Sequence, residues 1–205
     1  MSLLKSSRDV TRAAFNSWAD FYDSSWIINK ITEGWDNYLI NLSLPEPILD
    51  LGCATGRLLR KLETRGYSEL FGFDVSESCL NIAGENTDGE IVSLTQGYIE
   101  ALPYKSASFS AAVLSGVLHH LERPSAVLEE IARIVRARGI FIICEPRFFW
   151  GLRHIFNLAL DIYPVQGDRR YYTWKQIDAL AEKAGFRKKD LLKSAFSYIF
   201  IFKRC

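Results

Sequence analysis

The residues best placed to do chemistry are two acids and a turn of small residues between them. Asp50 precedes the turn at positions 52–56, which reads Gly-Cys-Ala-Thr-Gly, and Asp74 ends a later apolar run. Small residues let a backbone approach a ligand closely, and a helix after such a turn offers N–H groups that have no partner in the helix. A carboxylate nearby can accept hydrogen bonds from the hydroxyls of a ribose. The pattern therefore indicates a site for a nucleotide-like ligand.

The apolar spacing on either side of the turn predicts the elements that hold it. The run 48–51 is apolar except for Asp50, and after the turn Leu58, Leu59 and Leu62 recur at helical spacing. A short apolar run, a break of small residues and an amphipathic pattern are typical of a buried strand, a tight loop and a helix.

The positions of the glycines limit which nucleotide the turn can hold. A dinucleotide fingerprint needs glycines where Ala54 and Arg57 stand, and a P-loop needs Lys and Ser or Thr after its last glycine, where this chain has Arg57 and Leu58. The spacing therefore disfavours a nicotinamide oxidoreductase and a triphosphate site. The pattern that remains is D-x-G-x-x-x-G, from Asp50 to Gly56.

Asp74 is suited to hold a ribose. It lies 22 residues after Gly52, close to the offset of about 20 residues at which a ribose-binding acid follows the first glycine of a nucleotide-binding fold. The alternative is that Asp74 caps the helix predicted after it, but Ser76 is the better cap. We therefore expect Ser76 to cap that helix and to leave Asp74 free.

Further segments follow the turn in a fixed order. Residues 97–104 read GYIEALPY, residues 108–121 read SFSAAVLSGVLHHL, residues 128–139 read LEEIARIVRARG, and residues 140–146 read IFIICEP. With the turn, this series over residues 47–146 resembles the type 11 branch of the class I S-adenosylmethionine-dependent methyltransferases, which includes ubiquinone and menaquinone biosynthesis enzymes. The resemblance implies S-adenosyl-L-methionine as cofactor and, over residues 128–139, a helix before the fifth strand.

The resemblance also implies which residues contact the cofactor. They are Tyr22, Asp50, Gly52, Cys53, Ala54, Gly56, Asp74, Val75, Tyr98, Ile99, Glu100 and Ser115. Two of them depart from the family pattern: Ala54 replaces a usual third glycine, and Tyr98 replaces an Asp that accepts from the adenine amino group. Tyr98 can instead lie against the purine, with backbone groups at residues 99–100 recognising its edge.

The composition bounds the class of protein. The 205 residues suit one domain, and the net charge of +1 gives no broad field for nucleic acid. The four cysteines are scattered, with no C-x-x-C pair and no secretory leader before them, which argues against disulfides and against a metal site. Apolar runs are too short for stable membrane insertion. We expect a cytoplasmic protein.

Alternating strand and helix patterns predict an α/β fold, a Rossmann-like three-layer sandwich whose mostly parallel seven-stranded sheet ends in a C-terminal antiparallel hairpin. Four parts are expected within one domain: an N-terminal helical lid over 1–43, a cofactor-binding core over 47–146, a substrate-lid insert over 147–172, and a closing helix and hairpin over 173–205.

The expected reaction is in-line methyl transfer to an unidentified small acceptor. The insert is rich in aromatic residues, which favours an apolar or aromatic acceptor. A base is needed only where the acceptor keeps its proton at neutral pH. His119 and His120 follow the fourth strand and titrate near neutrality; His119 is the first candidate and His120 the second. The alternatives are that His119 only packs or caps, and that the chain is a non-catalytic S-adenosylmethionine-binding protein of the same fold.

Overall fold

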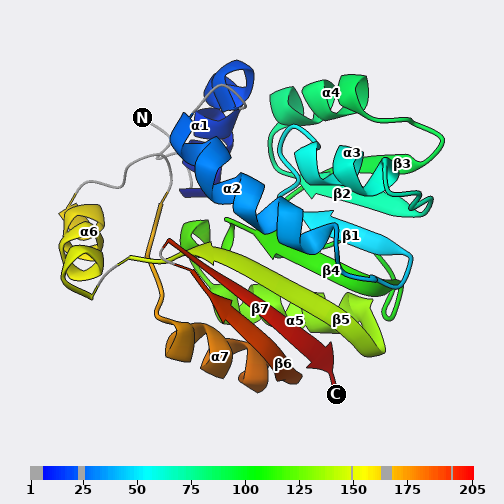
Figure 1. Ribbon diagram of the computed structural model, residues 1–205. Coiled ribbons are helices and arrows are strands. Elements are labelled where there is room, and N and C mark those ends of the chain that lie inside the picture. The colour runs from blue at the N-terminus through cyan, green and yellow to red at the C-terminus, as the bar shows by residue number, and fades with distance from the viewer. Residues whose placement is uncertain (1–6, 23–25, 149, 163–167, 195) are drawn as a thin grey trace.

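The computed structural model describes residues 7–22, 26–148, 150–162, 168–194 and 196–205. Seven strands form one sheet in the order β3-β2-β1-β4-β5-β7-β6, with helices on both of its faces (Figure 1). Neighbouring strands from β3 to β5 are parallel, and β7 pairs antiparallel with both β5 and β6. The predicted Rossmann-like fold with a closing antiparallel hairpin is confirmed.

The strands are short at the centre of the sheet and longer toward the C-terminal edge. They are β1 (Ile48–Leu51), β2 (Leu70–Asp74), β3 (Val92–Gln96), β4 (Phe109–Ser115), β5 (Val135–Pro146), β6 (Phe186–Lys193) and β7 (Ser197–Arg204). All four residues of β1 are buried, as expected for a strand covered on both faces.

The helices are α1 (Ser7–Tyr22), α2 (Trp26–Leu39), α3 (Arg57–Glu63), α4 (Glu77–Asn86), α5 (Pro124–Ile134), α6 (Trp150–Ile162) and α7 (Trp174–Lys183), with a 3-10 turn η1 (Leu118–His120) after β4. Thr173 and Gln176 form a capping box that begins α7. None of the described helices is both long and apolar enough to cross a membrane.

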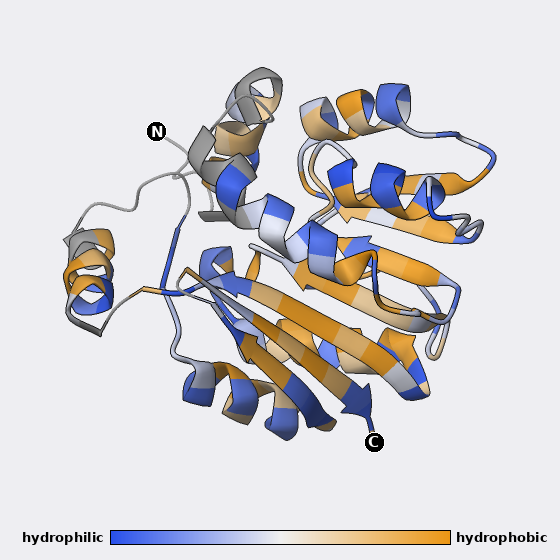
Figure 2. Cartoon of the chain, in the orientation of Figure 1, coloured by the Kyte–Doolittle hydropathy of each residue, from blue (hydrophilic) through white to orange (hydrophobic). Residues whose placement is uncertain are grey.

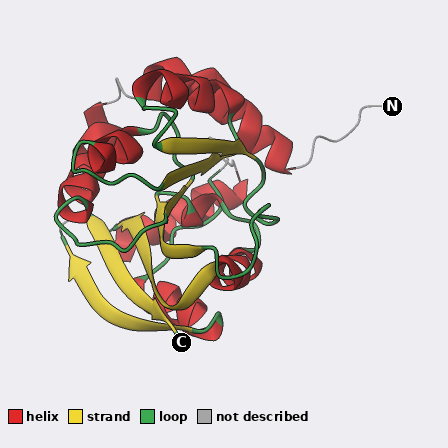
Figure 3. Cartoon of the chain, turned by 90° about the vertical axis from the view of Figure 1, so that its right-hand side faces the viewer, coloured by secondary structure: helices red, strands yellow, loops and turns green. Residues whose placement is uncertain are grey.

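Two apolar cores cover the two faces of the sheet. Leu49 and Leu51 of β1 pack with α5 and α7, whereas Ile48 packs with α2, α3 and α4. Because successive strand residues point to opposite faces, these helices form the two outer layers. Figure 2 shows the apolar residues concentrated on the strands, and the turned view in Figure 3 shows the twisted sheet between its helices.

The prediction of a helix over residues 128–139 is wrong for residues 135–139. Helix α5 ends at Ile134, and β5 begins at Val135, whose backbone is extended. Val135 pairs with Phe109, and the register shifts before the next pair. Arg138 has a positive φ of 64°, which a helix does not accept. Pairing of a β-branched residue with β4 outweighs the helical pattern of residues 135–139.

Candidate functional site

A cleft of about 850 Å³ opens at the carboxyl ends of the parallel strands. The carboxyl-terminal edge of a parallel sheet is where open α/β folds bind ligands. The lining residues are Thr11, Phe15, Gly52, Ala54, Phe73, Asp74, Val75, Gly97, Tyr98, Ile99, Glu100, Ser115, Gly116, Val117, His120, Leu121, Glu122 and Arg169. The cleft therefore brings together residues from β1, β2, β3 and β4 that lie far apart in the sequence.

The turn after β1 is held close to β2. The backbone N–H groups of Gly52 and Cys53 both donate to the Phe73 carbonyl, at 2.7 and 3.2 Å. Gly52 has φ of 77°, and a Cβ at this position would lie 2.3 Å from Cγ2 of Val117. Only glycine fits here without strain, so the turn forms an open cradle at the wall of the cleft.

Asp74 ties the end of β2 to that turn. Its Oδ2 accepts from the Ala54 N–H at 2.9 Å, and its Oδ1 accepts from the Ser76 N–H at 2.8 Å. Burial raises the pKa of this carboxyl, while the N–H groups of Ser76 and Ala54 oppose the shift. Ser76 does cap α4, through a bond from the Cys79 N–H. The expectation that Ser76 and not Asp74 caps this helix is confirmed. Asp74 instead accepts the two backbone bonds just described, and each of its oxygens keeps a second lone pair for a ligand.

The segment after β3 completes the wall of the cleft opposite the turn. The Gly97 N–H donates to the Asp74 carbonyl at 2.9 Å, and a Cβ on Gly97 would lie 2.6 Å from Phe73. The Tyr98 hydroxyl donates to Asp9 of α1 at 3.1 Å, and the Arg12 guanidinium lies 5.9 Å from the Tyr98 ring centroid. Tyr98 therefore joins α1 to the cleft wall.

A smaller cavity of about 360 Å³ lies on the other side of the turn and shares Gly52, Ala54 and Ser115 with the cleft. It is charged: Asp50 and Arg57 both line it. Burial, and then the neighbouring acids Asp36 and Asp74, raise the pKa of Asp50 to about 8, while Arg57 opposes this.

Asp36 of α2 also lines the smaller cavity, and two cations hold it. Nε of Arg57 lies 3.1 Å and Nζ of Lys61 lies 3.0 Å from its Oδ2. Because Asp36 is almost fully buried, these ion pairs fix Arg57 at the cavity wall.

Not every residue predicted from the sequence to contact the cofactor lines the cleft. Cys53 is buried beside the smaller cavity, and burial raises the pKa of its thiol. Gly56 has φ of 77° and lies just before α3 against Ala83, outside the lining of both cavities. The side chain of Tyr22 lies outside the described residues. Val75, Ile99, Glu100 and Ser115 line the cleft.

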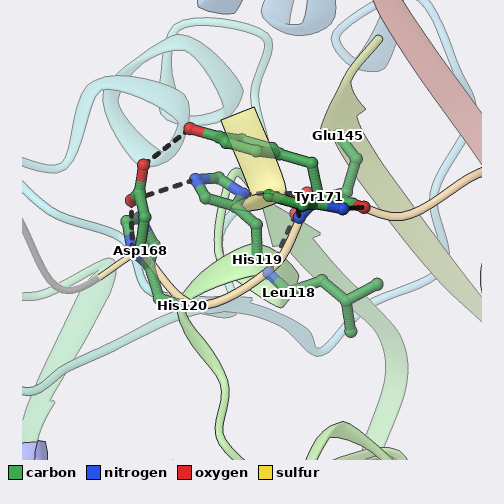
Figure 4. A network of polar contacts seen from close by, with 7 residues as sticks. Leu118, His119, His120, Glu145, Asp168 and Tyr171 are labelled. Atoms are coloured by element: carbon green, nitrogen blue, oxygen red, sulfur yellow. Dashed lines mark hydrogen bonds and ion pairs between the residues drawn. The ribbon is translucent and has the colours of Figure 1, made fainter. Parts of the chain in front are cut away.

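His119 is buried and does not line the cleft. Its Nδ1 lies 2.8 Å from Oε2 of Glu145, whose Oε1 accepts from the Leu118 N–H at 2.9 Å (Figure 4). The Tyr171 ring stacks on the imidazole, with centroids 5.1 Å apart. Burial lowers the pKa of His119, but the carboxylate of Glu145 outweighs it, and the pKa is raised.

His120, one residue on, does line the cleft. Its Nδ1 lies 2.9 Å from Oδ1 of Asp168. Asp168 is held in turn by the Tyr171 hydroxyl, which donates to Oδ2 at 2.6 Å. The N–H groups of Arg169 and Arg170 donate to the His119 carbonyl, at 2.8 and 3.1 Å. Residues 168–171, which we call the strap, are therefore fastened to the turn after β4.

His119, His120 and Asp168 place metal-ligand atoms within 4.8 Å of one another. Nδ1 of His120 lies 2.9 Å from Oδ1 of Asp168, which is closer than the roughly 3.3 Å that separates two ligands of one tetrahedral zinc. The cluster as it stands is a set of direct contacts among its own side chains.

Sequence reasoning predicted lids over residues 1–43 and 147–172, but it did not identify which of their side chains reach the cleft or the turn after β4. Phe15 was only one of many aromatic residues in the first 40, and Asp168 and Arg169 lie in an insert with no pattern of its own. Gly97 could be predicted from the sequence, because it begins the motif at residues 97–104. Val117, His120 and Leu121 belong to the motif at residues 108–121, but the sequence does not show which of its side chains face the cleft.

Comparison with known proteins agrees with this geometry. Residues 49–143 match the family model described as a methyltransferase domain of type 11. The chain is 25% identical over 206 residues to a demethylmenaquinone methyltransferase of Thermobifida fusca, covering 90% of this chain and 85% of the relative. It is 26% identical over 161 residues to an uncharacterized protein of Methanocaldococcus jannaschii, covering 68% of this chain but only 61% of the relative. A bifunctional biotin biosynthesis protein of Teredinibacter turnerae is 25% identical over 189 residues, which are 85% of this chain and 33% of the relative.

Solved structures share the fold. An S-adenosylmethionine-dependent methyltransferase of Thermotoga maritima superposes with a TM-score of 0.75 at 20% identity, over 95% of this chain and 100% of that one. A Haloferax volcanii protein solved in complex with the Trm112 methyltransferase activator gives 0.78 at 18% identity, over 92% and 96%. Together these comparisons support a class I S-adenosylmethionine-dependent methyltransferase of the type 11 branch.

Proposed function

We propose that this chain binds S-adenosyl-L-methionine across the two joined cavities and transfers its methyl group to a small apolar or aromatic acceptor. The observation that carries the proposal is that Asp74 and the turn at Gly52 face one cleft, although they end different strands. A buried carboxylate beside an open glycine turn suits the ribose of a nucleoside.

The adenosine part fits the larger cleft. Asp74 accepts the ribose hydroxyls with the lone pairs that its backbone bonds leave over. Tyr98 lies against the purine, and the backbone of residues 99–100 recognises the edge of the base. Val75 and Phe73 complete an apolar wall for the purine ring.

The amino acid part fits the smaller cavity. A zwitterionic amino acid carries an ammonium and a carboxylate, and this cavity presents an acid, Asp50, and a cation, Arg57. An ammonium beside Asp50 offsets the cost of ionising a buried carboxyl, so binding lowers the raised pKa of that group. Because the two cavities share Gly52, Ala54 and Ser115, one molecule can occupy both.

The bound cofactor supplies a methyl group activated by a sulfonium. The chain aligns the acceptor with it and excludes water. Helix α1 contributes Thr11 and Phe15 to the cleft, and Asn16 accepts from the Ser76 hydroxyl at 2.7 Å, which holds α1 over the cleft. We assign the lid role to residues 1–43 on one side and to the insert 147–172 on the other, with residues 47–146 as the cofactor-binding core and 173–205 as the closing unit.

The acceptor class follows from the remaining walls. Phe15, Val117 and Leu121 present apolar groups beside the turn after β4. A flat or apolar acceptor that removes these groups from water gains about 25 cal/mol for each Å² buried. The relative named as a demethylmenaquinone methyltransferase is consistent with an acceptor of this kind.

The second candidate is a protein that binds S-adenosylmethionine without methyl transfer. A structure described as the [4+2]-cyclase SpnF shares this fold, with a TM-score of 0.68 at 18% identity. The fold alone therefore does not fix the reaction.

Titration calorimetry with S-adenosylmethionine, S-adenosylhomocysteine, NAD and NADP tests the proposal. We expect binding of the first two and none of the nicotinamide nucleotides; the reverse would refute it. A labelled-methyl assay with a panel of phenols, quinols and amines then separates the enzyme from the non-catalytic binder.

A further inference from the structure

We propose that His120, oriented by Asp168, removes a proton from the methyl acceptor, and that the acceptor therefore carries an ionisable hydroxyl on an apolar body. This inference rests on the proposed function, because it names the proton acceptor and the substrate class of the same cleft. It moves the base role from His119, the first candidate from the sequence, to His120, the second.

The position of the His120 ring carries the inference. The ring lies on the cleft wall, with the Phe15 ring edge-on to it at a centroid distance of 5.2 Å. Nδ1 is buried and lies 2.9 Å from Oδ1 of Asp168, at an angle that departs from a linear hydrogen bond. The His120 side chain is 14% exposed and lines the cleft, and its Nδ1 is turned toward Asp168. Nε2 is therefore the ring nitrogen left for a ligand in the cleft.

Asp168 is itself fixed in place (Figure 4). The Tyr171 hydroxyl occupies Oδ2, which leaves Oδ1 for His120. The backbone bonds from the strap to the His119 carbonyl hold the carboxylate at this distance. A carboxylate at Nδ1 selects the tautomer with its proton on that nitrogen, so that the lone pair of Nε2 faces the cleft.

The surroundings shift the pKa values of the two histidines in opposite directions. Glu145, with Asp168 beyond it, raises the pKa of His119 against burial. Burial, and then the charge of His119, lower the pKa of His120 despite Asp168. Glu122 and Arg169 are the other charged residues of the cleft wall near this turn, and their charges are opposite. The surroundings thus push the pKa values of the two imidazoles apart, a separation that marks acid–base pairs.

In this proposal, methyl transfer and proton transfer occur together. The acceptor oxygen forms a bond to the methyl carbon while its proton passes to Nε2 of His120. The electron pair of the breaking carbon–sulfur bond returns to sulfur, which becomes the neutral thioether of S-adenosylhomocysteine. The imidazolium releases its proton to water when the products leave. A hydroxyl such as that of a phenol needs this help, because it holds its proton at neutral pH.

The three histidines of the chain make a direct test possible. Diethyl pyrocarbonate acylates neutral, accessible imidazoles, and mass spectrometry assigns the sites. We expect labelling at His120 and at the exposed His154, and none at His119. The pH midpoint of labelling at His120 should lie below the ordinary value of about 6.5, and it should move lower still in Asp168→Asn, because Asp168 raises the pKa of His120.

Asp178→Asn is the matched control, since Asp178 pairs with Lys188 on the surface of α7. Asp178→Asn should leave the pH midpoint of His120 labelling unchanged. Labelling at His119 instead of His120, or a His120 midpoint that Asp168→Asn does not move, would overturn the assignment of the base.

The substrate class is tested with a pair of probes. In the presence of S-adenosylhomocysteine, 4-methylphenol should slow labelling of His120 and not of His154, whereas 4-methylanisole, which lacks the hydroxyl proton, should protect less. Equal protection by both, or protection by neither, would refute the hydroxyl class. Calorimetry with S-adenosylhomocysteine on the same samples reports the proposed function separately, because cofactor binding does not require His120.

Discussion

The carboxylate of Asp74, at the end of β2, accepts a hydrogen bond of 2.9 Å from the backbone N–H of Ala54, in the turn after β1. The bond joins two segments that the sequence separates by about a tenth of the chain. It also explains how an acid and a glycine turn come to face the same cleft, since the acid itself fixes the turn.

Asp74→Ala should weaken binding of S-adenosylmethionine. The ribose loses a charged hydrogen-bond acceptor, which is worth about 1.5–3 kcal/mol or about 10- to 100-fold in Kd. Titration calorimetry measures the change. Asp88→Ala, on an exposed loop, is the control and should bind as the wild type does. An unchanged Kd for Asp74→Ala would remove this residue from the site.

Gly52→Ala should destabilise the fold more than Gly66→Ala does. Both glycines have positive φ, at 77° and 88°, which costs an alanine about 1–2 kcal/mol. Only at Gly52 does the new Cβ meet another group, Cγ2 of Val117 at 2.3 Å, whereas nothing lies within 4 Å at Gly66. The clash adds about 1–3 kcal/mol. Urea unfolding of the two variants measures the difference, and equal losses would show that the turn can relax away from Val117.

Asp50→Asn should flatten the pH dependence of stability. The folded-state pKa of Asp50 is about 8, above the ordinary value of 3.8, so between these values the folded chain holds a proton that the unfolded chain releases. The free energy of unfolding therefore falls as pH rises from about 4 to 8, by up to about 1.4 kcal/mol per pH unit. Urea unfolding at several pH values should show this slope in the wild type and a smaller one in Asp50→Asn. A slope that the variant leaves intact would contradict the assignment.

Glu145→Gln should lower the pKa of His119 and destabilise the protein more at pH 6 than at pH 8. A histidine whose pKa is raised on folding contributes stability below its unfolded pKa, and this contribution is lost as pH rises through the folded value. The bond to a charged partner is worth about 1.5–3 kcal/mol. NMR titration of the three histidines follows the pKa directly. If the His119 pKa stays where it was, Glu145 is not the cause of the shift.

Much of the fold could be predicted because strand β1, the glycine turn and helix α3 each have a sequence pattern of their own. The C-terminal hairpin was predicted for the same reason. The start of β5 was not, because residues 135–139 carry a helical pattern and only pairing with β4 makes them extended.

The part of the site that lies at the ends of individual strands could be predicted from the sequence. Gly52, Asp74 and Tyr98 follow strands whose order in the sheet brings their ends together. The roles of His119 and His120 could not be separated, since adjacent residues in one motif differ only in which side chain faces the cleft. The position of Asp168 could not be predicted, because it depends on hydrogen bonds from neighbouring residues of the strap to the distant His119 carbonyl.

The most direct test of the account is a crystal structure with S-adenosylhomocysteine. We predict that the ribose hydroxyls lie within about 2.7–3.2 Å of the Asp74 carboxylate, with the purine beside Tyr98 and the amino acid end between Asp50 and Arg57. A ligand bound elsewhere, or a cleft closed by rearranged side chains between Asp74 and Gly52, would contradict it.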